Sequence, residues 1–571
     1  MILYNMKIML SIISVIILVG LFTSCDKTMD LSPQGSVDAA ALSNTAGVDL
    51  VVVAAYASLT ESYYTGVINN WLTGSVYGGD ANKGTDPGDQ PYMDELELHG
   101  SLANNRIFNE KWIFCYNGIK CTNTAINQIN NTPEIGDDLR NRRLGEMKFL
   151  RAHFYYDLRR HFHMVPFIDE ILASTSNNIL AKNDSDVLPN IEADLSGAIQ
   201  LLPNIQDAVG RPNVWAAKAY LAKVYMFQGK FSEAVTLLKD IIDNGVNSKG
   251  VKYQLQTKYS DNFSIAMENS SETVFSVQHS TDAVGANANY DHMTNSLYGG
   301  ALNFGGYGFF QPSYVFVNSF QVDVNGLPLL DGSYMDYVIP GTNILGASQV
   351  NDADRTIPVD PRLDHTVGRR GIPFYDWGFP KNNWVRNQSN GGDFMPKKNL
   401  PRSSDSQIVT RGSALNTDII RFADVLLWYA EALAETGQLE AAREYVNMIR
   451  ERAANDLVMF EGTPAANYKV SPYPASYFDT KEKSLEAIRF ERKLEFGMEG
   501  IRFFDLQRWG FDLAKKELDF YTSKEKSYIV KYAGAVPFSE HMMYFPIPEA
   551  QIVSMHTDKN GDPYLTQNPG Y

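Results

Sequence analysis

One spacing of small residues occurs twice in this chain and restricts it to a narrow class of helical folds. In residues 418–454, apolar positions recur every three or four residues on both sides of Gly437, which predicts two amphipathic helices joined by a tight turn. Glycine permits the left-handed backbone that ends a helix, so the two helices should fold back on each other. The shared spacing is carried by Ala430, Gly437 and Ala442 and by Ala222, Gly229 and Ala234.

This spacing is typical of tetratricopeptide hairpins, in which small residues let two helices approach closely. A single hairpin cannot bury its apolar face, so further helices must pack against it. Helical periodicity predicts them at residues 48–59, 109–129, 140–162, 188–202 and 482–497. The expected fold is therefore mainly α, a tetratricopeptide-like helical hairpin array with an irregular, loop-rich inserted subdomain.

The N-terminus has the features of an export signal. Lys7 precedes an apolar run over residues 8–22, which at 15 residues is short for a membrane span. Residues 21–25 resemble a bacterial lipobox, in which a peptidase cuts before the cysteine and the thiol carries lipid. We therefore expect a lipoprotein signal peptide at 1–24 and a lipid anchor on Cys25. An ordinary cleaved signal with an unmodified cysteine is the alternative.

Composition changes divide the rest of the chain into helical and irregular parts of one unit. A lipidated cysteine and tether at 25–35 lead into an N-terminal helical block at 36–250, which contains a long aromatic loop at 69–104. Residues 251–416 lose helical periodicity and are rich in Gly, Asn, Ser and aromatic residues, which predicts an irregular, loop-rich insertion. A C-terminal helical block at 417–532 and an irregular C-terminal segment at 533–571 complete the chain.

Charge and motif content exclude several functions. The formal net charge is −16, from 50 basic and 66 acidic residues, which disfavours nucleic acid as a partner. The chain lacks the G-x-S-x-G, H-E-x-x-H and C-x-x-C patterns of hydrolases, zinc proteases and redox proteins. We expect no cofactor, no metal ion and no catalytic activity. The charged residues of 491–505 alternate with large apolar ones, which predicts ion pairs that lock the last helices to the array.

Several segments, in order along the chain, resemble the SusD/RagB family of outer-membrane nutrient-binding lipoproteins of Bacteroidetes. They are the Cys25 lipobox, Lys111-Trp112, Tyr116-Asn117, Asn123, and residues 145–152, 165–167, 216–225, 420–453, 488–496, 499–506, 546–548 and 567–571. The resemblance implies tetratricopeptide helices with an irregular subdomain inserted before the last helix pair. It also implies a non-catalytic protein at the cell exterior that captures a nutrient, usually a glycan, and sits on a SusC-like TonB-dependent transporter.

Candidate ligand-binding residues are the aromatic and short polar side chains of two irregular segments. Sugar rings present flat C–H faces that stack on aromatic rings, while carboxylates and amides satisfy the hydroxyls. The candidates are Trp71, Asp80, Asn82, Tyr92, Tyr290, Tyr298, Tyr307 and Phe309. The alternative for each aromatic residue is core packing in a turn-rich subdomain, as we expect for Trp112 and Trp509.

Two functions therefore follow from the sequence. The first, implied by the resemblance, is an outer-membrane lipoprotein that binds an oligo- or polysaccharide and delivers it to a SusC-like transporter for import; the resemblance also implies that the helical array grips the transporter. The alternative is a tetratricopeptide scaffold at the cell surface that binds a peptide or protein on its concave face. Substitutions in the two aromatic segments should abolish capture only under the first hypothesis.

Overall fold

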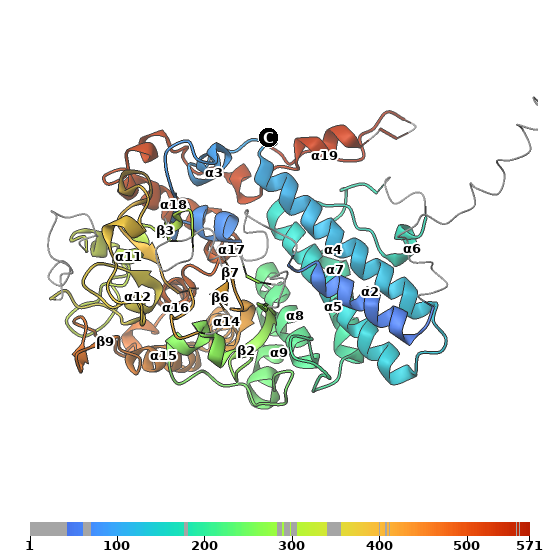
Figure 1. Cartoon of the computed structure of the whole chain (residues 1–571), viewed down its shortest axis with the longest axis horizontal. Coiled ribbons are helices and arrows are strands. Elements are labelled where there is room, and N and C mark those ends of the chain that lie inside the picture. Colours follow the sequence, from blue (N-terminus) through green and yellow to red (C-terminus); the bar gives the residue numbers. More distant parts are fainter. Residues whose placement is uncertain are drawn as a thin grey trace, which may run out of the picture.

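The computed structural model describes residues 43–571 with internal gaps, and it is built mainly from helices (Figure 1). The gaps are residues 61–69, 176–180, 282–287, 290–296, 299–304, 340–355, 399, 406–407, 410–411, 556 and 559. The signal peptide, Cys25 and the tether predicted from the sequence lie outside the described residues. No helix within the described part of the chain is both long enough and apolar enough to cross a membrane.

The first helices form a bundle on the right of Figure 1. Helix α2 spans Thr45–Ala57, α4 spans Arg106–Asn130, α5 spans Asp137–Phe162 and α7 spans Leu188–Leu201. Asn105 begins α4, where its side-chain oxygen accepts a hydrogen bond from the Ile107 amide at 3.0 Å. These elements confirm the helices predicted at 48–59, 109–129, 140–162 and 188–202.

The two predicted hairpins are also present, and they pack against each other. Helix α8 (Val214–Gln228) turns into α9 (Phe231–Asn244) at Gly229, and α14 (Phe422–Glu435) turns into α15 (Leu439–Ala454) at Gly437. Both glycines have positive φ angles, 71° and 84°, as the small-residue spacing requires. Helix α14 lies against α9, so the two hairpins are in contact although the insertion separates them in sequence.

The start of the second hairpin differs from the sequence prediction. Residues 418–421 were expected to open a helix, but Thr417–Arg421 is strand β8, antiparallel to β2 (Thr273–Val277). The segment is rich in β-branched residues, which favour a strand when a partner strand is available, as β2 is here. Tertiary pairing therefore overrides helical periodicity here, and α14 begins at Phe422.

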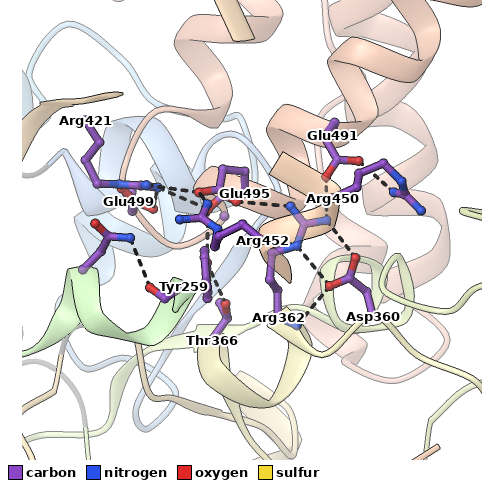
Figure 2. A network of polar contacts seen from close by, with 12 residues as sticks. Tyr259, Asp360, Arg362, Thr366, Arg421, Arg450, Arg452, Glu491, Glu495 and Glu499 are labelled. Atoms are coloured by element: carbon purple, nitrogen blue, oxygen red, sulfur yellow. Dashed lines mark hydrogen bonds and ion pairs between the residues drawn. The ribbon is translucent and has the colours of Figure 1, made fainter. Parts of the chain in front are cut away.

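Within the described residues, four α-helices follow the second hairpin, and the first of them, α16, contributes to an internal network of ion pairs (Figure 2). Helix α16 spans Lys481–Phe496, α17 spans Arg502–Trp509, α18 spans Phe511–Glu525 and α19 spans Glu549–Ser554. Glu495 on α16 is buried and faces Arg452 at 2.5 Å, Arg421 at 3.1 Å and Arg362 at 3.2 Å. The predicted ion-pair network is confirmed, and it joins α16 to α15, to β8 and to the insertion.

Short elements complete the chain; α11, α12 and β9 lie on the left of Figure 1, whereas α6 lies on the right. The helical ones are α3 (Pro91–Glu97), α6 (Glu170–Ala173), α11 (Tyr314–Asn318), α12 (Arg362–Thr366) and α13 (Gln388–Gly391). The strand pairs are β1 (Ala81–Gly84) with β3 (Phe309–Pro312), β4 (Val367–Gly368) with β5 (Met395–Pro396), β6 (Ile408–Val409) with β7 (Gly412–Ser413), and β9 (Met459–Phe460) with β10 (Thr463–Pro464).

One hydrophobic core runs through most of these elements. Its buried side chains extend in sequence from Val48 on α2 to Leu565 near the C-terminus. A smaller cluster, which includes Phe374, Trp384 and Met395, lies within the insertion. The insertion therefore has a local core of its own and is also anchored to the helical array through β3, α11 and α12.

Candidate functional site

The two segments that carry the predicted binding residues are joined by a strand pair. Strand β1 runs antiparallel to β3, with Asn82 opposite Gln311 and Gly84 opposite Phe309. Backbone hydrogen bonds of this kind fix the register of both segments. Residues that are more than two hundred positions apart in sequence are therefore held at one place in the fold.

The predicted loop at 69–104 is folded, which corrects the sequence analysis. It contains a π-helix, η1 (Trp71–Val76), followed by β1 and α3, and Trp71 is only 1% exposed. The Trp71 ring packs 5.3 Å from Phe310 and 6.2 Å from Phe309, measured between ring centroids. The glycines of this segment allow close backbone approach, since a Cβ on Gly74 would lie 1.7 Å from the Gly500 carbonyl oxygen. Trp71 and Phe309 are therefore core side chains rather than exposed rings.

Asp80 and Asn82 are also buried. The hydroxyls of Tyr521 and Tyr532 donate to Asn82 Oδ1 at 2.9 and 2.6 Å, and Asn82 Nδ2 donates to the Gly391 carbonyl at 3.2 Å. Burial raises the pKa of Asp80 to about 7. These contacts fix the strand pair from its buried side. Asp80 and Asn82 therefore support the strand pair and do not form part of the protein surface.

The remaining candidates lie nearer the surface. Tyr298 is 38% exposed, while Tyr92 on α3 and Tyr307 are half-buried. Tyr290 lies outside the described residues. The guanidinium of Arg106 lies 5.6 Å from the centroid of the Tyr92 ring, so that ring has a cation on one face. Of the described aromatic candidates, Tyr298 offers the most exposed ring.

Arg386 is the residue at this site that sequence reasoning missed. Its guanidinium lies 5.2 Å from the centroid of the Tyr298 ring, 2.7 Å from Asp86 and 2.9 Å from Asp89. The Tyr298 amide donates to the Trp384 carbonyl at 3.1 Å, which places the ring beside Arg386. No sequence motif marks Arg386. The run of Asn and Arg residues after Trp384 was the available signal.

We define the Arg386 patch as Asp86, Asp89, Tyr298, Tyr307 and Arg386. Asn390 links the segment that carries Arg386 to the segment that carries Asp86 and Asp89. The Asn390 side-chain amide donates to the carbonyls of Gly84 and Thr85 at 2.8 and 3.0 Å. The patch therefore combines an aromatic ring, a guanidinium fork and two carboxylates that remain partly open to solvent. Such a set can stack on a flat ring and exchange hydrogen bonds with hydroxyl groups.

Within the described part of the chain, no group of three or more His, Cys, Asp or Glu side chains is arranged to hold a metal ion. The two carboxylates of the patch, Asp86 and Asp89, instead form ion pairs with Arg386.

The fold and this surface define a class: a helical-repeat protein in which an inserted irregular region and an N-terminal segment together form a polar, aromatic patch. The SusD family model matches residues 271–571, and a model described as "Starch-binding associating with outer membrane" matches residues 51–226. The chain belongs to the SusD family.

Similar proteins agree with this assignment along almost the whole chain. A SusD-like protein of Bacteroides ovatus is 23% identical over 527 residues, covering 89% of this chain and 84% of the relative. The crystal structure of a SusD superfamily protein from Bacteroides vulgatus has a TM-score of 0.67 at 20% identity, covering 92% and 99% of the two chains. Surface glycan-binding protein A from Bacteroides thetaiotaomicron, in complex with laminarihexaose, has a TM-score of 0.62 at 19% identity, covering 92% and 99%. These structures share the fold of this chain.

Proposed function

We propose that this protein binds a glycan at the Arg386 patch. The observation that carries the proposal is that the exposed Tyr298 ring and Arg386 lie together beside Asp86 and Asp89. A sugar ring stacks on tyrosine, and the carboxylates and guanidinium exchange hydrogen bonds with its hydroxyls. A protein of similar fold, surface glycan-binding protein A from Bacteroides thetaiotaomicron, has a structure in complex with laminarihexaose, which supports a glycan as the ligand class.

The charge of the patch favours a neutral glycan. It contains two carboxylates and one guanidinium, in a chain whose net charge is −16. An anionic polysaccharide would meet like charges both at the patch and across the molecule. We therefore expect neutral oligosaccharides to bind more tightly than sulfated or uronate-rich ones.

The experiment is isothermal titration calorimetry of soluble protein from residue 26 onward, screened against neutral and anionic oligosaccharides, laminarihexaose included, beside an oligopeptide library. Tyr298→Ala should weaken glycan binding about tenfold or more, because the stacking face is lost. Tyr337→Ala is the matched control, since Tyr337 is 49% exposed and is not part of the patch. Peptide binding that is unchanged in Tyr298→Ala, without glycan binding, would favour the helical-scaffold hypothesis instead.

Delivery and anchoring form the second part of the proposal. We propose that lipid on Cys25 anchors the protein to the outer membrane facing the cell exterior, and that it passes the glycan to a SusC-like TonB-dependent transporter. Membership of the SusD family and the outer-membrane association in the description of the N-terminal family match support this role. In the native host, Cys25→Ala should release the protein from outer-membrane fractions. Wild-type protein should co-purify with a TonB-dependent barrel from detergent-solubilised membranes. If the protein is purified without such a barrel, this result would argue against the transporter partner.

A further inference from the structure

A second site lies among the C-terminal helices, between α16, α17 and α18. It is a cavity of about 300 Å³ and shares no lining residue with the Arg386 patch. Leu330, Phe490, Trp509 and Leu513 form apolar walls and are only half-buried. A volume of this size, at the lower end of ligand pockets, accommodates one sugar ring or one aromatic ring.

The interior of this cavity carries more positive than negative charge. Its inner side chains include the cations Arg489, Lys493 and Arg502 and the single carboxylate of Glu517. Glu517 accepts from Arg502 at 3.0 Å and also raises the pKa of Lys493 by its charge, so one carboxylate is shared between two of these three cations. The charged residues at the exposed rim balance one another: Glu482, Lys483, Glu486 and Lys516. A locally basic interior is notable in a chain with a net charge of −16.

Arg489 is incompletely satisfied within the described part of the chain. Its Nε is buried and has no hydrogen-bond acceptor there. The Glu435 carboxylate is 3.9 Å from an Arg489 terminal nitrogen, and the same carboxylate pairs at 2.5 Å with Lys481. The guanidinium lies 5.4 Å from the centroid of the Trp509 ring, so a cation and an aromatic wall meet in the cavity.

Lys493 adds a second cation from the same helix, one turn further along. Its side chain is buried, and its ammonium donates to the Tyr334 hydroxyl over a long 3.4 Å. Burial lowers the pKa of Lys493 to about 8 and also lowers that of Arg489, as expected where anions do not fully compensate the charges. An anionic ligand group would supply the missing compensation for both residues.

We propose that this cavity binds a small organic carboxylate with a flat or apolar body. Arg489 and Lys493 donate to the carboxylate, and Trp509 and Phe490 contact the ring that carries it. The inference goes beyond the proposed glycan function, because the site, the ligand charge and the residues all differ from those of the Arg386 patch. The carboxylate can belong to an acidic sugar or to an aromatic acid, and the experiment separates these two sources.

The test uses the protein from residue 26 onward, with binding followed by saturation-transfer NMR and calorimetry. The probes are methyl glucuronide and phenylacetate, each compared with its neutral counterpart, methyl glucoside and 2-phenylethanol. We expect at least one acid to bind while its neutral counterpart does not. Arg489→Gln and Lys493→Met should each weaken that acid about tenfold or more, because each removes a charge-assisted hydrogen bond.

Arg443→Gln on α15 is the matched control, because the Arg443 side chain is 24% exposed and that of Arg489 is 26% exposed. It should bind the acid like the wild-type protein. Arg489 is partly open to solvent, so Arg489→Gln keeps the test decisive if the buried Lys493→Met variant fails to fold. Absence of binding of both acids at millimolar concentration, equal binding of the neutral counterparts, or unchanged affinity in Arg489→Gln would each overturn the proposal. Unchanged acid binding by Tyr298→Ala would confirm that the two sites are separate.

Discussion

Arg386 and Asp86 form an ion pair, with 2.7 Å between Nε and Oδ2, that links the insertion to the N-terminal part of the chain. Asp89 accepts from the same guanidinium at 2.9 Å, and the Tyr298 ring lies beside it. Each of these side chains is partly exposed, so the contacts position the patch more than they stabilise the protein. Recognition and stability should therefore respond differently to substitutions.

The first prediction concerns Arg386. Arg386→Met keeps the length of the side chain but removes its charge and its hydrogen-bond donors. We expect glycan affinity to fall about tenfold, because a charge-assisted donor and the positioning of Asp86, Asp89 and Tyr298 are lost. The melting temperature should change little. Calorimetry and thermal melting of the same preparation measure both quantities, and a large loss of stability with normal affinity would contradict this assignment.

A second prediction concerns the packing of α13 on the strand pair. A Cβ on Gly391 would lie 1.6 Å from Gln311 Oε1 and 2.7 Å from the Gly84 Cα atom. Gly391→Ala must therefore displace β1 or β3, which should lower both glycan affinity and the melting temperature. Gly534→Ala is the control, because a Cβ there meets no atom within 4 Å. Equal behaviour of the two variants would show that the close packing has no effect on the patch.

The third prediction concerns the buried network around Glu495. Burial alone raises the pKa of this carboxyl, but Arg452, Arg421 and Arg362 outweigh that effect and hold the pKa well below its usual range. Glu495→Gln leaves these guanidiniums undercompensated and should reduce the free energy of unfolding by about 3–5 kcal/mol. Chemical denaturation measures this loss. Glu440→Gln, which alters an exposed pair with Arg443, should leave the denaturation midpoint unchanged.

The fourth prediction is a pH effect at Glu525, beneath the strand pair. Burial raises the pKa of Glu525 from its ordinary 4.5 to about 8, although the Val315 amide at 2.8 Å and the Asn82 side chain at 3.3 Å donate to it. Between these two pH values only the folded chain holds the proton. This carboxyl therefore makes folding progressively less favourable as pH rises from 4.5 to 8.

Glu525→Gln removes the titrating group, so its melting temperature relative to wild type should increase as pH is raised across this window. Thermal melts at pH values near 5 and 8.5 provide the comparison. Glu549→Gln, at an exposed position of α19, should follow the wild-type protein at both values. A constant difference between Glu525→Gln and wild type at both values would show that Glu525 has no such raised pKa.

The helical array could be predicted from the sequence because its signals are local. Spacing of apolar residues and the positions of Gly229 and Gly437 depend on neighbours within one or two turns, and the structure confirms both hairpins. Strand β8 was wrongly expected to be helical because its partner, β2, lies far away in sequence. A strand that is fixed by a distant partner has no local signal of comparable strength.

The site was less predictable, for the same physical reason. The two segments were identified correctly as aromatic and glycine-rich, but composition does not reveal which rings are buried. Trp71 and Phe309 pack against the core, while Tyr298 remains exposed, and this difference depends on tertiary contacts such as the packing of Trp71 on Phe309 and Phe310. Arg386 joins the patch only through tertiary contacts, so no short motif could identify it.

The pairing of β1 with β3 also determines when during folding the Arg386 patch can form. Its components come from residues 86–89, 298–307 and 386, so loops of roughly two hundred and three hundred residues must close before they meet. Closing such loops is slow compared with forming the local helical hairpins. A newly synthesised chain should therefore acquire its helices before the patch is complete, so formation of the patch should report that folding is complete.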